Sequence, residues 1–197
     1  MEFLSIGLIV VLIIACLIIV SVFQKSHQEK EIKRAGNKGE AIFNNMLKSI
    51  LNNEDVLLNN VCLNTDDGKT EIDNLIINKN GIFIIEIKNY NGTLSGGIDD
   101  YEWTKCKVTP GDNVYIKKAK NPIRQMKRQI YILSKHLKNN NIWIWINGYV
   151  YFVNHNSPVD DECVINDIRE FDQIIHKSQD KEYNKNIINS AINLLSK

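Results

Sequence analysis

The sequence predicts a mixed α/β domain, with a central sheet flanked by helices, preceded by one N-terminal transmembrane helix. Three observations support this fold class. The first 23 residues are predominantly apolar, two later runs are apolar at every position, and other segments repeat apolar residues at helical spacing. A chain of 197 residues leaves room for one domain of ordinary size once the apolar segment is subtracted.

The N-terminal segment is long enough to cross a bilayer. Residues 3–23 contain no Asp, Glu, Lys, Arg, Asn or Gln, and a helix of about 20 apolar residues spans a hydrocarbon core of about 30 Å. A cleavable signal peptide is the alternative, but it needs a basic start, and only Met1 and Glu2 precede the run. We therefore expect a retained anchor over residues 1–23 and a juxtamembrane linker or helical stalk over residues 24–35.

Charges that follow the apolar segment predict its orientation. Positive residues beside a membrane span tend to stay cytoplasmic, and four follow here: Lys25, Lys30, Lys33 and Arg34. The expected location is the cell membrane, single-pass, with the N-terminus outside and the remaining domain cytoplasmic. The four cysteines form no C-x-x-C pair, so they indicate neither a zinc site nor a disulfide framework.

Residues 36–197 are expected to form the α/β domain. Its predicted elements are a helix over residues 38–51, strands over 56–62, 71–78 and 81–88, hairpins over 91–116, a helix over 121–137, a strand over 146–154, and helices over 166–176 and 183–195.

Local signals justify these elements. The runs 75–77 and 82–85 are apolar on both faces, which is typical of strands in the middle of a covered sheet. Asn121 and Pro122 suit the cap and first position of a helix. Trp143 and Trp145 alternate with isoleucines, and we interpret them as packing in a strand rather than as platforms for stacked bases.

Three charged residues stand at the end of the apolar central strands. Glu86 and Lys88 are two residues apart, so they project from the same face of one strand. A buried charge costs several kcal/mol unless it is paired or bound to a metal. Asp73 lies in the preceding strand across a tight turn, so we expect it beside Glu86, where the two carboxylates could share one cation.

These residue types fit hydrolysis of a phosphodiester. Carboxylates supply hard oxygen ligands for Mg²⁺. Lys88 would orient the attacking water, help it lose a proton, or bind the phosphate. Glu40 would complete the metal shell or hold a second metal, and Gln125 would orient another group through a hydrogen bond.

Basic residues concentrate in the segment 117–138, although the net charge of the chain is only +1. The segment contains no Asp or Glu and includes Lys117, Lys118, Lys120, Arg124, Lys127, Arg128, Lys135 and Lys138. Arg124, Lys127 and Arg128 are the expected nucleic-acid-binding residues. A solvated helix face and contact with anionic lipid headgroups are the alternatives.

Several segments together resemble the nuclease-related domain (NERD) family, which in turn resembles the PD-(D/E)xK restriction-endonuclease-like superfamily. In chain order these segments are Gly36–Glu40, Glu71–Ile77, Gly81–Tyr90, Trp103 and Asn121–Gln125. The resemblance is best over residues 36–138. One departure is Ile72, which stands where the superfamily's name has proline.

The resemblance implies a restriction-endonuclease-like sheet and a nuclease that uses Mg²⁺ or Mn²⁺ on nucleic acid, with DNA ahead of RNA. It places the family's acidic, lysine and glutamine positions on Glu40, Asp73, Glu86, Lys88 and Gln125, with Asp73 and Glu86 as metal ligands. Two alternatives stay open. One is an inactive, membrane-tethered nucleic-acid-binding or scaffolding module, and the other is a lipid-surface or protein-interaction domain.

Overall fold

The computed structural model describes residues 2–177 and 182–196, without the side chains of residues 2–13, 28 and 32. Its elements are α1 (Glu2–Ile50), β1 (Val56–Thr65), β2 (Gly68–Asn78), β3 (Gly81–Lys88), β4 (Thr93–Ser95), β5 (Glu102–Val108), β6 (Val114–Lys120), α2 (Pro122–Asn139), β7 (Ile146–Phe152), β8 (Val164–Ile165), α3 (Ile168–His176) and α4 (Lys185–Leu195). Contacts divide the chain into two compact units, Met1–Lys38 and Gly39–Lys197.

Helix α1 is one continuous helix of 49 residues. Residues 24–35 are therefore helical, as in the stalk alternative, and the helix predicted from residue 38 continues them without a break. No proline interrupts residues 2–50, so nothing forces a break. Glu40, expected in the first turn of a helix, therefore lies well inside one. Among the residues with described side chains, no helix is long and apolar enough to cross a bilayer. Residues 1–13 of the predicted anchor lie outside those described side chains.

A mixed five-stranded sheet forms the centre of the domain, as predicted. Its order is β1-β2-β3-β7-β8. The first three strands pair antiparallel, while β7 pairs in parallel with both β3 and β8. Strand β3 is central and buried from Gly81 to Ile87, which agrees with its continuous apolar run.

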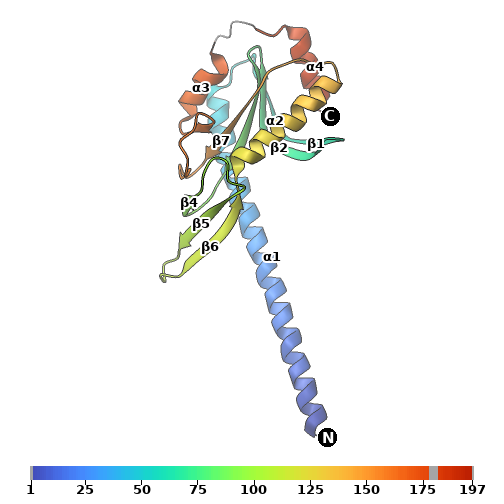
Figure 1. Cartoon of the computed structure of the whole chain (residues 1–197), viewed down its shortest axis with the longest axis vertical. Helices are drawn as coiled ribbons and strands as arrows, with labels where there is room; N and C mark the ends of the chain where they lie inside the picture. The colour runs from blue at the N-terminus through green and yellow to red at the C-terminus, as the bar shows by residue number, and fades with distance from the viewer. Residues whose placement is uncertain (1, 178–181, 197) are drawn as a thin grey trace. The chain divides into compact units, whose positions relative to one another are not determined.

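Helices cover both faces of this sheet (Figure 1). On one face, α2 and α4 contribute Ile132, Leu133, Leu137, Ala191 and Leu195 to a core that includes alternate residues of β2 and β3. On the other face, the C-terminal part of α1 and helix α3 contribute Phe43, Leu47, Phe171 and Ile175. The result is a three-layer arrangement in which β3 carries its residues into both cores.

A second, three-stranded sheet has the order β4-β5-β6. Trp103 of β5 is fully buried, and its ring stacks at 6.0 Å from the ring of Phe152 on β7. Its indole Nε1 donates a hydrogen bond to the carbonyl of Gly97. This residue therefore fixes the base of the β5–β6 hairpin against the main domain, while most of β6 stays exposed.

The prediction for Trp143 and Trp145 was wrong. Both side chains are about two-thirds exposed, at 66% and 67%, and they precede β7 instead of lying within it. Buried and exposed side chains do alternate in this segment, because Ile142 is buried between exposed neighbours. The tryptophans occupy its outward side, and the amine of Lys138 lies 5.7 Å from the ring of Trp143.

Candidate functional site

The carboxylate of Glu86 is the centre of the candidate site. Its side chain is 1% exposed, at the end of the apolar β3. One carboxylate oxygen, Oε1, pairs with the amine of Lys88, and the other, Oε2, accepts a hydrogen bond of 2.6 Å from Nε2 of Gln129. Both oxygens of this buried charge are therefore held by polar partners.

Gln129 of α2 ties the helix to two strands. Its Nε2 atom also donates to the carbonyl oxygen of Glu71 on β2, at 2.8 Å. Its Oε1 atom is buried and has no hydrogen-bond partner within the described structure. This amide thus bridges β2 and β3 at the site and keeps one free acceptor.

Asp73 lies beside Glu86, as the hairpin predicted. The last paired residues of β2 and β3 are Asn74 and Ile85, so Asp73 and Glu86 are the next two residues on the opposed strands. The Oδ2 atom of Asp73 accepts a hydrogen bond of 3.0 Å from the backbone N–H of Ile87.

Burial favours the neutral forms of Glu86 and Asp73, so the pKa of each acid is raised. Burial raises the pKa of Glu86, and repulsion from Asp73 adds to this, although Lys88 and Gln129 oppose it. Burial likewise raises the pKa of Asp73, against the hydrogen bond from Ile87 and the charge of Lys88. Burial alone would lower the pKa of Lys88, but the charge and hydrogen bond of Glu86 together with Tyr90 and Asp73 outweigh it, and the pKa rises.

Glu40 is a third acidic side chain near the pair. Burial raises its pKa, and repulsion from Asp73 and then Glu71 raises it further, while Lys88 lowers it. The structure therefore brings the four predicted charged residues, Glu40, Asp73, Glu86 and Lys88, into one electrostatic neighbourhood.

The donor set fits a hard cation such as Mg²⁺. Within the described part of the chain, no group of three or more histidine, cysteine or acidic side chains is arranged to enclose a metal ion. Mg²⁺ usually keeps several waters and takes only one or two protein carboxylates. Asp73 and Glu86 supply that number, and a bound cation would offset their repulsion and the cost of burying them.

Gln125 lies one turn before Gln129 on α2 and lines a different feature. It borders an open groove of about 1210 Å³, larger than the roughly 300–1,000 Å³ typical of small-molecule pockets. The lining of this basic groove is Lys69, Thr70, Asp100, Tyr101, Glu102, Lys118, Lys120, Asn121, Arg124, Gln125 and Arg128. Five cationic residues face two acidic ones, so the groove suits an extended anion.

The sequence missed Gln129, although a signal was present. This glutamine lies three residues after Met126 and four before Leu133, within the apolar stripe of α2. An amide in such a stripe is buried and must find a polar partner. That partner is Glu86.

The three predicted nucleic-acid-binding residues do not share one surface. Arg124 and Arg128 line the basic groove. Arg124 donates to the carbonyl of Asp99 and lies 3.9 Å from the centre of the Tyr101 ring, while Arg128 donates to the carbonyl of Lys69. Lys127 is exposed on another side of α2, where its charge acts on Asp161.

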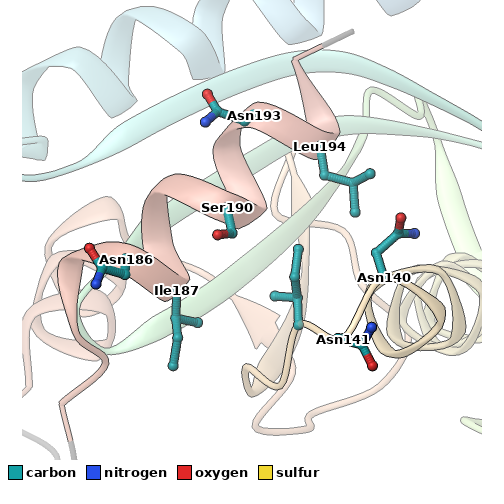
Figure 2. A pocket seen from close by; sticks show the side chains of 8 residues that line it. Asn140, Asn141, Asn186, Ile187, Ser190, Asn193 and Leu194 are labelled. Carbon is teal, nitrogen blue, oxygen red and sulfur yellow. The ribbon is translucent and has the colours of Figure 1, made fainter.

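A second hollow, of about 480 Å³, lies between α4 and the end of α2 (Figure 2). Figure 2 shows Ile187, Ser190 and Leu194 on the side of α4 that faces Asn140 and Asn141. Its described lining carries amide, hydroxyl and aliphatic groups without an acid, a base or a thiol.

Comparison with known proteins identifies the family of the chain. The model of the nuclease-related domain family matches residues 35–153. An uncharacterised protein of Bacillus anthracis is 30% identical over 122 residues, which cover 60% of this chain and 53% of that protein. The chain thus matches about half the length of this relative. No solved structure is significantly similar to the chain. The family match spans more than half of the sequence and includes Glu40, Asp73, Glu86 and Lys88, so the chain belongs to the nuclease-related domain (NERD) family.

Proposed function

We propose that this protein hydrolyses phosphodiester bonds of nucleic acid with a divalent metal ion, Mg²⁺ or Mn²⁺. The observation that carries the proposal is the buried Glu86–Lys88 pair opposite Asp73. Burying two acids that repel each other costs free energy of folding. A bound cation would offset this cost. Membership of a nuclease-related family supports the same chemistry.

Each residue has a distinct role in this proposal. Asp73 and Glu86 would hold the cation, which stabilises charge on the phosphate and lowers the pKa of a bound water when present. Lys88 would orient the attacking water or bind the phosphate as a point charge. Gln129 would keep Glu86 in place, and Glu40 would serve as an auxiliary acid.

Nucleic acid is the substrate that the surface supports. The basic groove is lined by Gln125, which lies one helical turn from Gln129, the partner of Glu86. Arg124 and Arg128 would contact phosphates there, whereas the position of Lys127 suits this role less. We place DNA ahead of RNA, and an assay on both polymers decides between them.

Loss of the charged groups should abolish cleavage. Asp73→Asn and Lys88→Met preserve side-chain size, so the domain should fold, while the rate of DNA or RNA cleavage by the 197-residue chain should fall by about 10²–10⁴-fold. Cleavage is measured on labelled single-stranded and duplex substrates with Mg²⁺ or Mn²⁺, and folding by thermal unfolding. Wild-type rates in both variants would remove this site from the mechanism. Salt-sensitive binding without any cleavage would instead indicate the inactive module.

Binding of Mg²⁺ should raise the melting temperature, Tm, of the protein. An acid whose pKa is raised on folding stabilises the fold at low pH, and this contribution is lost as pH rises through the raised pKa. Because Asp73 and Glu86 are such acids, Mg²⁺ should raise Tm more at pH 8 than at pH 5. At about 100 times Kd the rise should be about 5–10 °C.

Asp73→Asn should raise the metal-free Tm at pH 8 and remove most of the response to Mg²⁺. Exposed Glu162→Gln is the matched control and should keep the wild-type response. An unchanged Mg²⁺ response in Asp73→Asn would exclude Asp73 as a ligand.

Gln129, more than Gln125, should control the catalytic step. Gln129→Leu leaves one oxygen of Glu86 without its amide donor, so kcat should fall by about 10–100-fold, as for partners that orient metal ligands. Gln125→Leu should act mainly on KM, because its side chain borders the groove. Steady-state kinetics of both variants separate the roles, and the reverse pattern would return the orienting role to Gln125.

We also propose that residues 3–23 anchor the chain in the cell membrane, with the N-terminus outside and the domain in the cytoplasm. The uncharged segment and the basic residues that follow support this. The protein should stay in the membrane fraction after an alkaline carbonate wash, and external protease should spare the domain in spheroplasts. Release by carbonate would refute the anchor.

A further inference from the structure

The β5–β6 hairpin has one face that carries three lysines. Successive strand residues point to opposite sides, and the register pairs Lys105 with Lys117 and Lys107 with Tyr115. These four side chains therefore share a face, called here the lysine face. Trp103 lies at its base and attaches it to the main domain.

Crowding these lysines has a cost. Like charges directly opposed on two strands destabilise a sheet, and partial burial followed by repulsion from Lys107 and Lys117 lowers the pKa of Lys105. Lysines often protect an exposed edge strand from pairing with another chain. That explanation covers Lys117 on the edge strand β6, but not Lys105 and Lys107 on β5, the central strand of this sheet.

The lysine face adjoins the candidate site. The amine of Lys105 lies 5.2 Å from the centre of the Tyr90 ring. Tyr90 follows Lys88 by two residues, and the charges of Lys88 and Glu86 both act on its hydroxyl. One aromatic side chain therefore separates the first lysine of the face from the catalytic pair.

We propose that the lysine face binds the sugar–phosphate backbone of the nucleic acid next to the bond that the candidate site hydrolyses. The identity of this ligand rests on the proposed function. Three cations beside a phosphodiesterase-type site are complementary to the polyanionic backbone. Tyr115 is 55% exposed among them, and an aromatic ring between lysines suits contact with a base or sugar.

This surface is distinct from the basic groove. Lys118 and Lys120 of the groove lie on the opposite side of β6, because they alternate with Lys117. That opposite side also carries exposed Val108, Val114 and Ile116, which would suit a lipid surface. Contact of the lysine face with Tyr90 favours nucleic acid, so lipid binding becomes an outcome of the test.

The experiment measures binding in EDTA, where cleavage cannot interfere. The triple variant Lys105→Gln, Lys107→Gln and Lys117→Gln of the whole chain should bind DNA or RNA with a shallower salt dependence. The slope of log K against log salt should drop by about 2–3, since each lost phosphate contact removes roughly 0.7–0.9. Tm confirms that the variant folds.

Two matched controls accompany it. Lys48→Gln, Lys177→Gln and Lys185→Gln together remove the same charge at exposed positions elsewhere in the domain, and Val108→Thr with Ile116→Thr alters the opposite face of the hairpin. Both controls should keep the wild-type slope. If the control with Lys48, Lys177 and Lys185 replaced shows an equal decrease in the slope of log K against log salt, the effect is one of general charge and the proposal is overturned.

The outcomes separate this inference from the proposed function. A wild-type slope in the hairpin variant overturns the lysine face, while cleavage still supports the site. A reduced slope in a protein that never cleaves supports the face and refutes hydrolysis. If the hairpin variant loses binding to anionic vesicles but keeps its nucleic-acid binding, the surface serves lipid and the proposal fails.

Discussion

The buried carboxylate of Glu86 is the constraint on which the site depends. It lies near the end of a strand whose residues from Gly81 to Ile87 are buried and otherwise apolar, so its charge must be balanced locally. Lys88 on the same strand and Gln129 from α2 hold the two oxygens of this carboxylate, and the same amide nitrogen of Gln129 also donates to the carbonyl of Glu71 on β2. The contacts that balance the charge therefore also align β2, β3 and α2.

Much of the arrangement could be predicted because it follows from neighbours in sequence. Continuous apolar runs identified β2 and β3 as central strands, and the tight turn between them fixed the register that opposes Asp73 and Glu86. The two-residue spacing placed Lys88 on the face of Glu86. Asn121 and Pro122 marked the start of α2, where the side chain of Asn121 accepts a hydrogen bond from the N–H of Ile123.

Contacts between distant elements could not be predicted in the same way. Gln125 and Gln129 lie on the same side of α2, about 6 Å apart along its axis, and their order relative to Glu86 depends on where the helix crosses the sheet. Sequence periodicity gives the face of a helix, not that crossing point. Alternation likewise separated Ile142 from Trp143 and Trp145, but it did not tell which side meets the core. The short β8 has only two residues and leaves no periodic signal.

The crossing point of α2 links the position of the acids to that of the basic groove. Gln129 holds α2 against Glu71 and Glu86, while Arg128 and Arg124, one and five residues earlier, line the basic groove. A slip of the helix by one turn, about 5.4 Å, would break the hydrogen bond to Glu86 and displace both arginines from the groove. The buried amide of Gln129 therefore fixes the distance from α2 to the carboxylate of Glu86. It also fixes the distance from that carboxylate to the basic groove. A phosphate held by the arginines would then keep a fixed position relative to Asp73 and Glu86.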